Sequence, residues 1–109
     1  MYEVICNERE ISGKTIDTFK REIYNANILE VEAGTNGYCG GDTGHGSRTY
    51  IRIQDMGGTD IQVLKTHDSH GNEDGVILAL GGDSELTTII EALQFIVKVL
   101  DDQRREKNE

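Results

Sequence analysis

The chain has 109 residues, a formal net charge of -9, 36% hydrophobic residues, 6% aromatic residues and no proline. This length allows a single modest core, so we expect one domain spanning residues 1–109. The negative charge argues against broad contact with nucleic acid, which requires a basic surface, although one local pocket can still be positive. No apolar run reaches the roughly 18 residues of a membrane span, and the first ten residues lack a signal peptide's basic and apolar regions, so we expect a cytoplasmic protein.

The first predicted element is a short amphipathic helix over residues 15–25. Ile16, Phe19 and Ile23 recur there at a spacing of three to four residues, which is typical of one helix face. Asp17, near the start of this segment, suits the positive end of a helix dipole.

Strand candidates occur at short intervals through the rest of the chain. In Thr49–Ile53 the residues alternate between apolar or β-branched and polar or aromatic, which is the two-residue period of a half-buried strand. The other candidates are residues 1–6 (a strand or an unattached lead-in), 28–32, 61–65 and 76–80, the last expected to be buried on both sides. The intervals are too short for helical crossovers, so we expect an antiparallel sheet.

A long C-terminal helix is the last predicted element, with Ser84 as N-cap and an end near Arg104. Its apolar stripe, expected to lie on the sheet, consists of Leu86, Ile89, Ile90, Leu93, Val97 and Leu100. Three further residues extend the apolar arc beyond this stripe: Ala92, Phe95 and Val99. We expect them at the interface of a homo-oligomer, the alternative being that the N-terminal helix covers them. The predicted fold is therefore α+β: a small antiparallel sheet of three to four strands with a short N-terminal helix and a long C-terminal helix.

The most unusual segment reads GTNGYCGGDTGHG from Gly34 to Gly46, followed directly by Ser47-Arg48-Thr49. Glycine is costly to order, so such a cluster indicates either close approach of a ligand or a tight structural crossing. The phosphate-loop pattern GxxxxGK, the dinucleotide pattern GxGxxG and the nucleophile pattern GxSxG are all missing from the sequence. These three enzyme classes are therefore excluded.

A small anionic ligand is the leading interpretation of this segment. Glycine N–H groups form anion-binding nests, Arg48 can grip a phosphate with two donors, and Tyr38 can stack on a base. The predicted ligand-binding residues are Thr35, Asn36, Gly37, Tyr38, Gly40, Gly41, Asp42, His45, Gly46, Ser47, Arg48 and Thr49, with Arg104 and Arg105 contributed by a second subunit. A glycine-rich hairpin without ligand is the simpler alternative, as is a solvated helix end for the two arginines. No cofactor, metal or membrane partner is predicted.

Besides a ligand-binding protein, two other function classes remain open from the residues alone. The second class is a zinc- or cysteine-dependent hydrolase. Its zinc ligands would be Cys39, His45, His67 and His70, and Cys39 or Ser47 with His45 and Asp42 contains the residue types of a nucleophilic triad. The triad residues all come from one loop, and the chain has no CxxC or HExxH pattern. The third class is an acidic interaction module that mimics nucleic acid and blocks a basic protein.

The sequence GTNGYCGGDTGHGSRTYIRI, together with a long C-terminal helix ending in Arg104 and Arg105, resembles the phage Thoeris anti-defence sponge family. Members of that family sequester cyclic ADP-ribose-type signals, and in some cases cyclic oligonucleotides, in pockets between subunits without cleaving them. The resemblance implies a nucleotide-binding inhibitor of bacterial immune signalling that acts in the cytoplasm of the infected host. It assigns no individual binding residue to this sequence.

Overall fold

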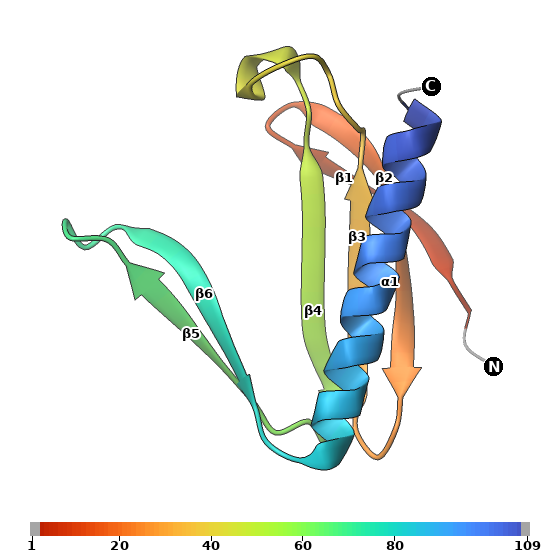
Figure 1. Ribbon diagram of the computed structural model, residues 1–109, viewed down its shortest axis with the longest axis vertical. Helices are drawn as coiled ribbons and strands as arrows, with labels where there is room; N and C mark the ends of the chain where they lie inside the picture. Colours follow the sequence, from red (N-terminus) through yellow and green to blue (C-terminus); the bar gives the residue numbers. More distant parts are fainter. Residues whose placement is uncertain (1–2, 108–109) are drawn as a thin grey trace.

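The computed structural model describes residues 3–107, which form six strands, a short 3-10 turn and one long helix (Figure 1). Strands β1 (Ile5–Ile11), β2 (Lys14–Tyr24), β3 (Ile28–Thr35) and β4 (Thr49–Gly57) form an antiparallel sheet in that order. Strands β5 (Ile61–His67) and β6 (Glu73–Leu80) form a separate antiparallel pair, and α1 (Asp83–Lys107) lies along β3 on one face of the larger sheet. No helix within residues 3–107 has both the length and the apolar character needed to cross a membrane.

The predicted N-terminal helix, and with it the predicted fold of two helices on a single sheet, is wrong. Residues 15–24 belong to β2, which pairs with β1 on one side and β3 on the other. Phe19 and Ile23 pack towards α1, whereas Ile16 is buried on the opposite face, as strand alternation requires. The three-to-four spacing thus arose from a strand buried on both faces. Residues 1–2 of the first predicted strand lie outside the described residues.

The core lies between β3 and α1. Leu29, Val31 and Ala33 alternate along β3 and are completely buried. Val31 belongs to a cluster with Ala92 of α1, and Ala33 belongs to a second cluster with two further α1 residues, Ile96 and Val99. Each large aliphatic side chain so buried contributes about 1.5–3 kcal/mol to stability.

The face of α1 that meets the sheet differs from the prediction. Ala92 and Val99, expected at a subunit interface, are buried against the sheet of their own chain, and Phe95 packs against the same clusters. Most of the predicted stripe faces solvent instead; its exposed members are Leu86, Ile90, Leu93 and Val97. The sheet-facing line also contains buried Thr88 and Gln103, whose polar character made it look less apolar in the sequence. Small Ala92 at its centre lets the helix approach the sheet closely.

A buried asparagine ties the start of α1 to the rest of the fold. Asn27 Oδ1 accepts hydrogen bonds from Ser84 Oγ (2.6 Å) and Thr88 Oγ1 (3.0 Å), and its Nδ2 donates to Thr59 Oγ1 (3.0 Å). Because α1 begins at Asp83, Ser84 lies within the first turn and not at the predicted N-cap position. The network holds the β2–β3 turn, the segment before β5 and the helix start together.

An ion pair lies on the face of the sheet opposite α1. The Glu32 carboxylate is fully buried and accepts from Arg9 Nε (2.8 Å), Arg9 Nη2 (2.7 Å) and Thr18 Oγ1 (2.6 Å). Arg52 Nε lies 3.5 Å away, and the Arg9 guanidinium stacks over the Tyr50 ring at 5.1 Å. The hydrogen bonds from Arg9 lower the pKa of Glu32 to about 2, since they stabilise its charged form.

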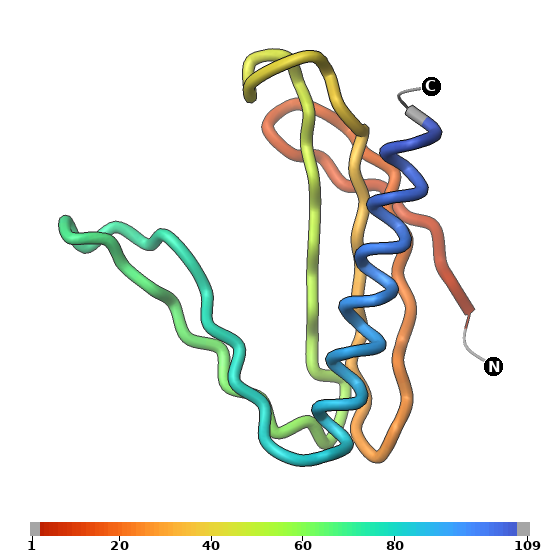
Figure 2. Tube along the Cα trace, viewed as in Figure 1, coloured from red at the N-terminus to blue at the C-terminus, as the bar shows by residue number. Residues whose placement is uncertain are grey.

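The β5–β6 pair, here called the arm, projects away from the larger sheet (Figures 1 and 2). The predicted burial of β6 on both sides is wrong, because Val76, Ile77 and Leu78 are all exposed. The radius of gyration is 15.5 Å, whereas a compact chain of this length has about 13 Å. The arm accounts for the open shape of the molecule.

Candidate functional site

The glycine-rich segment forms the loop between β3 and β4, and Asn36 joins its two ends. The Arg48 N–H donates to Asn36 Oδ1 (2.7 Å), and Asn36 Nδ2 donates to the Gly46 carbonyl (2.9 Å). The Asn36 N–H in turn donates to the Arg48 carbonyl (3.2 Å). Both ends of the Asn36 side-chain amide are therefore used to close the loop.

The tip of the loop is a 3-10 turn at Thr43–His45. Asp42 Oδ1 accepts from the Gly44 N–H (3.0 Å) and lies 3.1 Å from His45 Nδ1, with both side chains exposed. Gly46 ends the turn with a φ of 96°, a left-handed conformation that glycine adopts without strain. Asp42 and His45 thus stabilise the tip.

Arg48 also belongs to the framework of the loop. Its Nη1 donates to the carbonyls of Thr43 (3.0 Å) and Ser47 (2.9 Å). The guanidinium is therefore held against loop carbonyls, and Arg48 is not among the residues that line the nearby pocket.

Gly34 marks a tight crossing and not a ligand contact. It sits opposite Thr18 in the β2–β3 register, and a Cβ atom placed on it would lie 2.3 Å from the Asp17 carbonyl oxygen and 2.8 Å from Thr18 Cα. Both neighbours are backbone atoms of β2, which cannot move without disturbing the sheet. At this end of the segment, the close approach of β2 and β3 explains the glycine without a ligand.

A small pocket lies between the loop and the C-terminal part of α1. Its volume is about 140 Å³, and its lining residues are Thr35, Gly37, Tyr38, Ser47, Thr49, Leu100 and Arg104. Arg104 Nη1 donates to Tyr38 Oη at 3.3 Å, and Arg104 also pairs with Asp101 one turn earlier. Tyr38 first, and Asp101 second, hold the pKa of Arg104 above its usual range. An aromatic ring and a permanent cation thus meet at one edge of the pocket.

Gln103, which the sequence did not single out, holds α1 to the base of this loop. Its side chain is buried; Oε1 accepts from the Thr35 N–H (2.9 Å), and Nε2 donates to the Asp17 carbonyl (2.9 Å). Gln103 continues the spacing of the buried residues Ala92, Ile96 and Val99 on the sheet-facing side of α1, and this position is the sequence signal of its role. Leu100, also unassigned to the site by the sequence, supplies the apolar wall.

The pocket brings together only some of the predicted ligand-binding residues. Those that line it are Thr35, Gly37, Tyr38, Ser47, Thr49 and Arg104. Those that do not are Asn36, Gly40, Gly41, Asp42, His45, Gly46, Arg48 and Arg105. Arg105 pairs with Asp101, and Arg104 reaches the loop of its own chain, whereas from the sequence it was expected to come from a second subunit.

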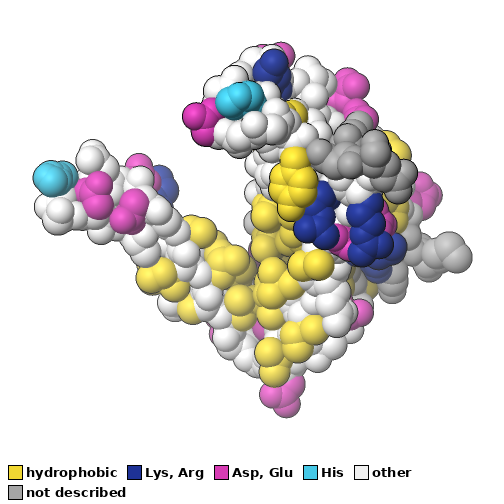
Figure 3. All heavy atoms as spheres, turned by 45° about the horizontal axis from the view of Figure 1, so that its top comes forward, with side chains coloured by type: hydrophobic (Ala, Val, Ile, Leu, Met, Phe, Trp, Pro, Cys, Tyr) yellow, Lys and Arg dark blue, Asp and Glu magenta, His cyan; other side chains and the backbone are white. Residues whose placement is uncertain are grey.

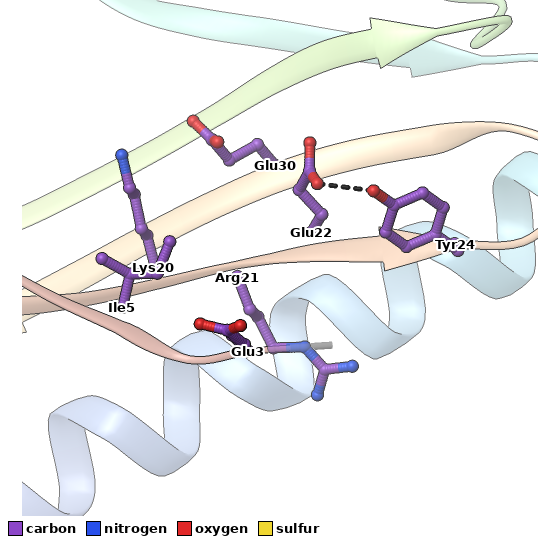
Figure 4. Close-up of a pocket in the computed structure, with 7 residues that line it drawn as sticks. All are labelled: Glu3, Ile5, Lys20, Arg21, Glu22, Tyr24 and Glu30. Carbon is purple, nitrogen blue, oxygen red and sulfur yellow. Dashed lines mark hydrogen bonds between the residues drawn. The ribbon is translucent and has the colours of Figure 1, made fainter. Parts of the chain in front are cut away.

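A larger hollow of about 440 Å³ lies beside β1 and β2 but suits an anion poorly (Figure 4). Its lining includes the carboxylates of Glu3, Glu22 and Glu30, with Tyr24 Oη donating to Glu22 at 2.6 Å. The Arg21 side chain extends to the other side of the strand, where its guanidinium lies 5.8 Å from the Phe95 ring centroid. Lys20 also lines the hollow, but three carboxylates outnumber this one ammonium group and together repel a phosphate.

The residues of the alternative zinc site lie in two separate places. Cys39 and His45 belong to the glycine-rich loop, whereas His67 and His70 lie at the end of the arm (Figure 3). Within residues 3–107, no three His, Cys, Asp or Glu side chains are grouped so that they can hold one metal ion. A four-ligand site from these residues is not formed within one chain.

The chain has no match among protein-family models, curated proteins or solved structures. Its function must therefore be inferred from what the pocket can bind. The Thr35 and Ser47 hydroxyls already donate to loop carbonyls, at 3.0 and 2.6 Å. The groups best placed to recognise a ligand are therefore the Arg104 guanidinium and the Tyr38 ring, which suit a phosphate and a flat base.

Proposed function

We propose that this protein binds a small phosphate-bearing nucleotide, of the cyclic signal type, and retains it without cleavage. The single observation that carries the proposal is the contact between Arg104 and Tyr38 at the edge of a hydroxyl-lined pocket. Arginine offers a planar fork of donors to phosphate, and tyrosine offers a stacking surface to a base. Of the alternative nucleophiles only Ser47 lines this pocket, where its hydroxyl donates to the Gly37 carbonyl (2.6 Å). Its supposed base His45 does not line the pocket, which favours binding over hydrolysis.

The biological role that we propose is sequestration of an immune signal by a phage protein within the infected bacterium. It rests on the resemblance of the glycine-rich segment to the Thoeris anti-defence sponges. The pocket of about 140 Å³ is smaller than the roughly 300–1,000 Å³ of ordinary ligand sites. We therefore propose that one chain supplies part of the site and that a neighbouring chain of a homo-oligomer encloses the rest of the ligand.

Arg104→Ala is expected to weaken nucleotide binding roughly 10- to 100-fold, because it removes a charge-assisted contact to phosphate. Arg105→Ala is the matched control, since it removes an equal charge next to Arg104 from a side chain outside the pocket lining. Its affinity should stay within about threefold of the wild type. The measurement is isothermal titration calorimetry with cyclic ADP-ribose and a panel of cyclic dinucleotides.

Two results would contradict the proposal. One is equal weakening by both substitutions, which would indicate a general effect of charge and not a site at Arg104. The other is conversion of the nucleotide to a product during incubation, since a sequestering protein returns its ligand intact after heating. Mass spectrometry of the small molecules released by heat, after exposure to a bacterial nucleotide extract, identifies the ligand and its chemical state.

A further inference from the structure

One asparagine of the chain, Asn36, is followed directly by glycine. It is the only such position in the sequence, since every other asparagine precedes a glutamate, an alanine or an isoleucine. The side-chain amide of asparagine can be attacked by the backbone nitrogen of the next residue, and a side chain on that residue obstructs the attack. Gly37 has no side chain, so its nitrogen can approach the Asn36 amide closely.

In the closed loop, hydrogen bonds hold both of the groups that would react. The Asn36 side-chain amide spans the loop between the Arg48 N–H (2.7 Å) and the Gly46 carbonyl (2.9 Å). The Gly37 N–H donates to Thr35 Oγ1 (3.0 Å). The Gly37 nitrogen can attack the Asn36 amide only when these bonds are released. The closed loop therefore restrains the reaction.

The stretch beyond Gly37 gives the closed loop little support. Residues 38–45 are all exposed, and the loop projects beyond the ends of β3 and β4 (Figure 1). Two contacts that tie this stretch to other parts of the chain, Arg104 to Tyr38 and Arg48 to the Thr43 carbonyl, are themselves exposed to water. Segments with exposed hydrogen bonds and few buried contacts open locally while the rest of a domain stays folded. Such opening releases Asn36 without unfolding the sheet.

We propose that the Asn36–Gly37 pair is a site of spontaneous deamidation, at which the chain modifies itself when the loop opens. Hydroxide removes the Gly37 amide proton, and the nitrogen attacks Asn36 Cγ. A Cγ–N bond forms, the Cγ–Nδ2 bond breaks, and Nδ2 takes a proton from water and leaves as ammonia. Water then opens the succinimide ring and leaves aspartate or isoaspartate at position 36. One water is consumed and one ammonia is released, so no oxidant or cofactor is needed.

Either product weakens the closure of the loop. A carboxylate at position 36 cannot donate to the Gly46 carbonyl, and its negative charge faces that oxygen. Isoaspartate also adds one carbon to the backbone, which displaces Gly37 from its bond with Thr35. Because Thr35, Gly37 and Tyr38 all line the pocket, the modification alters the candidate site irreversibly. The inference concerns the loop itself and does not depend on the proposed nucleotide.

The first test follows conversion at each asparagine by peptide mapping with mass spectrometry, after incubation of the folded chain at pH 9. Conversion at Asn36 should exceed that at the exposed Asn25 and Asn72, which precede alanine and glutamate. Thr35→Val removes the acceptor of the Gly37 N–H and should raise the rate at Asn36 roughly 2- to 10-fold, the range of one hydrogen bond. Thr35→Ser, the matched control, keeps the hydroxyl and should stay within about twofold of the wild type.

The second test asks whether the product opens the loop, by limited proteolysis with chymotrypsin, which cleaves after Tyr38. Asn36→Asp reproduces one product and should raise the rate of this cleavage roughly 2- to 10-fold, because cleavage follows the population of the open form. Asn72→Asp is the matched control. It makes the same change of charge in the turn between β5 and β6, and it should leave cleavage after Tyr38 unchanged.

Three results would overturn the proposal. Conversion at Asn36 no faster than at Asn72 would show that the closed loop prevents the reaction. An unchanged rate in Thr35→Val would show that opening does not control it. If circular dichroism shows that this variant is unfolded, Ser47→Ala, which frees the Gly37 carbonyl, replaces it with the same expected increase. Equal cleavage after Tyr38 in Asn36→Asp and Asn72→Asp would show that the modified loop stays closed. Failure of the unmodified protein to bind a nucleotide would count against the proposed function alone.

Discussion

Replacing Gly34 with alanine is expected to lower the free energy of unfolding by about 3 kcal/mol. The added methyl group would lie 2.3 Å from the Asp17 carbonyl oxygen and 2.8 Å from Thr18 Cα. A contact of this kind forces β2 and β3 apart, and β3 carries the core residues Val31 and Ala33. Urea denaturation followed by circular dichroism measures the change.

Gly57→Ala is the control for this experiment. Gly57 also lies in a strand, and a Cβ atom there would meet only Ile28 Cδ1, at an ordinary 3.9 Å. Alanine at such a position reduces the conformational freedom of the unfolded chain. The free energy of unfolding of this variant should therefore equal that of the wild type or exceed it by a few tenths of a kcal/mol. A Gly34→Ala protein as stable as the Gly57→Ala protein would show that β2 and β3 are not held at the distance described here.

The second large effect concerns the buried Glu32 carboxylate and its dependence on pH. Its pKa is about 2 in the folded protein against an ordinary 4.5, so the folded state binds this proton less readily than the unfolded chain. The stability that Glu32 provides is therefore complete above pH 4.5 and is lost as the pH falls towards 2. After allowance for the partly exposed Arg9 partner, we expect a loss of about 2 kcal/mol across this window.

Comparison with Glu32→Gln isolates this contribution from the other titrating carboxylates. At pH 7 the variant should be less stable than the wild type by about 2 kcal/mol, because it leaves Arg9 without its charged partner. The difference should shrink as the pH falls from 4.5 towards 2, where Glu32 is protonated in the unfolded chain and about half protonated in the folded protein. Glu73→Gln, which breaks the exposed pair with Lys65, should show a difference within about 0.5 kcal/mol at every pH. If the stability difference between the wild type and Glu32→Gln did not shrink as the pH was lowered, the role assigned to Glu32 would be contradicted.

The sequence predicted those elements whose pattern had one interpretation. The alternation of Thr49, Ile51 and Ile53 predicted β4, and the long apolar run after Ser84 predicted α1; both are confirmed. The segment around Phe19 failed because β2 is buried on both faces, and its apolar residues then fall at helical intervals. Its backbone hydrogen bonds run to the adjacent strands β1 and β3, and the spacing of apolar residues within one segment does not reveal such pairing.

The face of α1 that packs on the sheet could not be predicted from the sequence, for a related reason. Both of its long faces are apolar, and the one with larger residues was expected on the sheet. The structure instead buries a line with Ala92 at its centre and Thr88 and Gln103 near its ends. These polar side chains hydrogen-bond to Asn27 and to the backbone of Thr35 and Asp17. A polar residue that finds a buried partner cannot be distinguished in the sequence from one that faces water.

For the candidate site, the sequence identified the loop but not the arrangement within it. Tyr38 and Arg104 were both predicted, yet their contact joins residues 66 positions apart. Arg48 was expected to grip the ligand because of its charge, whereas its donors hold the Thr43 and Ser47 carbonyls. Charge can be read from a sequence, but competition from nearby carbonyls cannot.

The order of the strands has a consequence for how the chain folds during synthesis. Strands β1 to β4 pair only with their neighbours in sequence, so the larger sheet can form progressively as the chain leaves the ribosome. The helix that covers Leu29, Val31 and Ala33 is made after every strand. Until α1 emerges, this apolar face is open to other nascent chains. We expect the interval between synthesis of β3 and of α1 to be when the protein is most prone to aggregate and most dependent on chaperones.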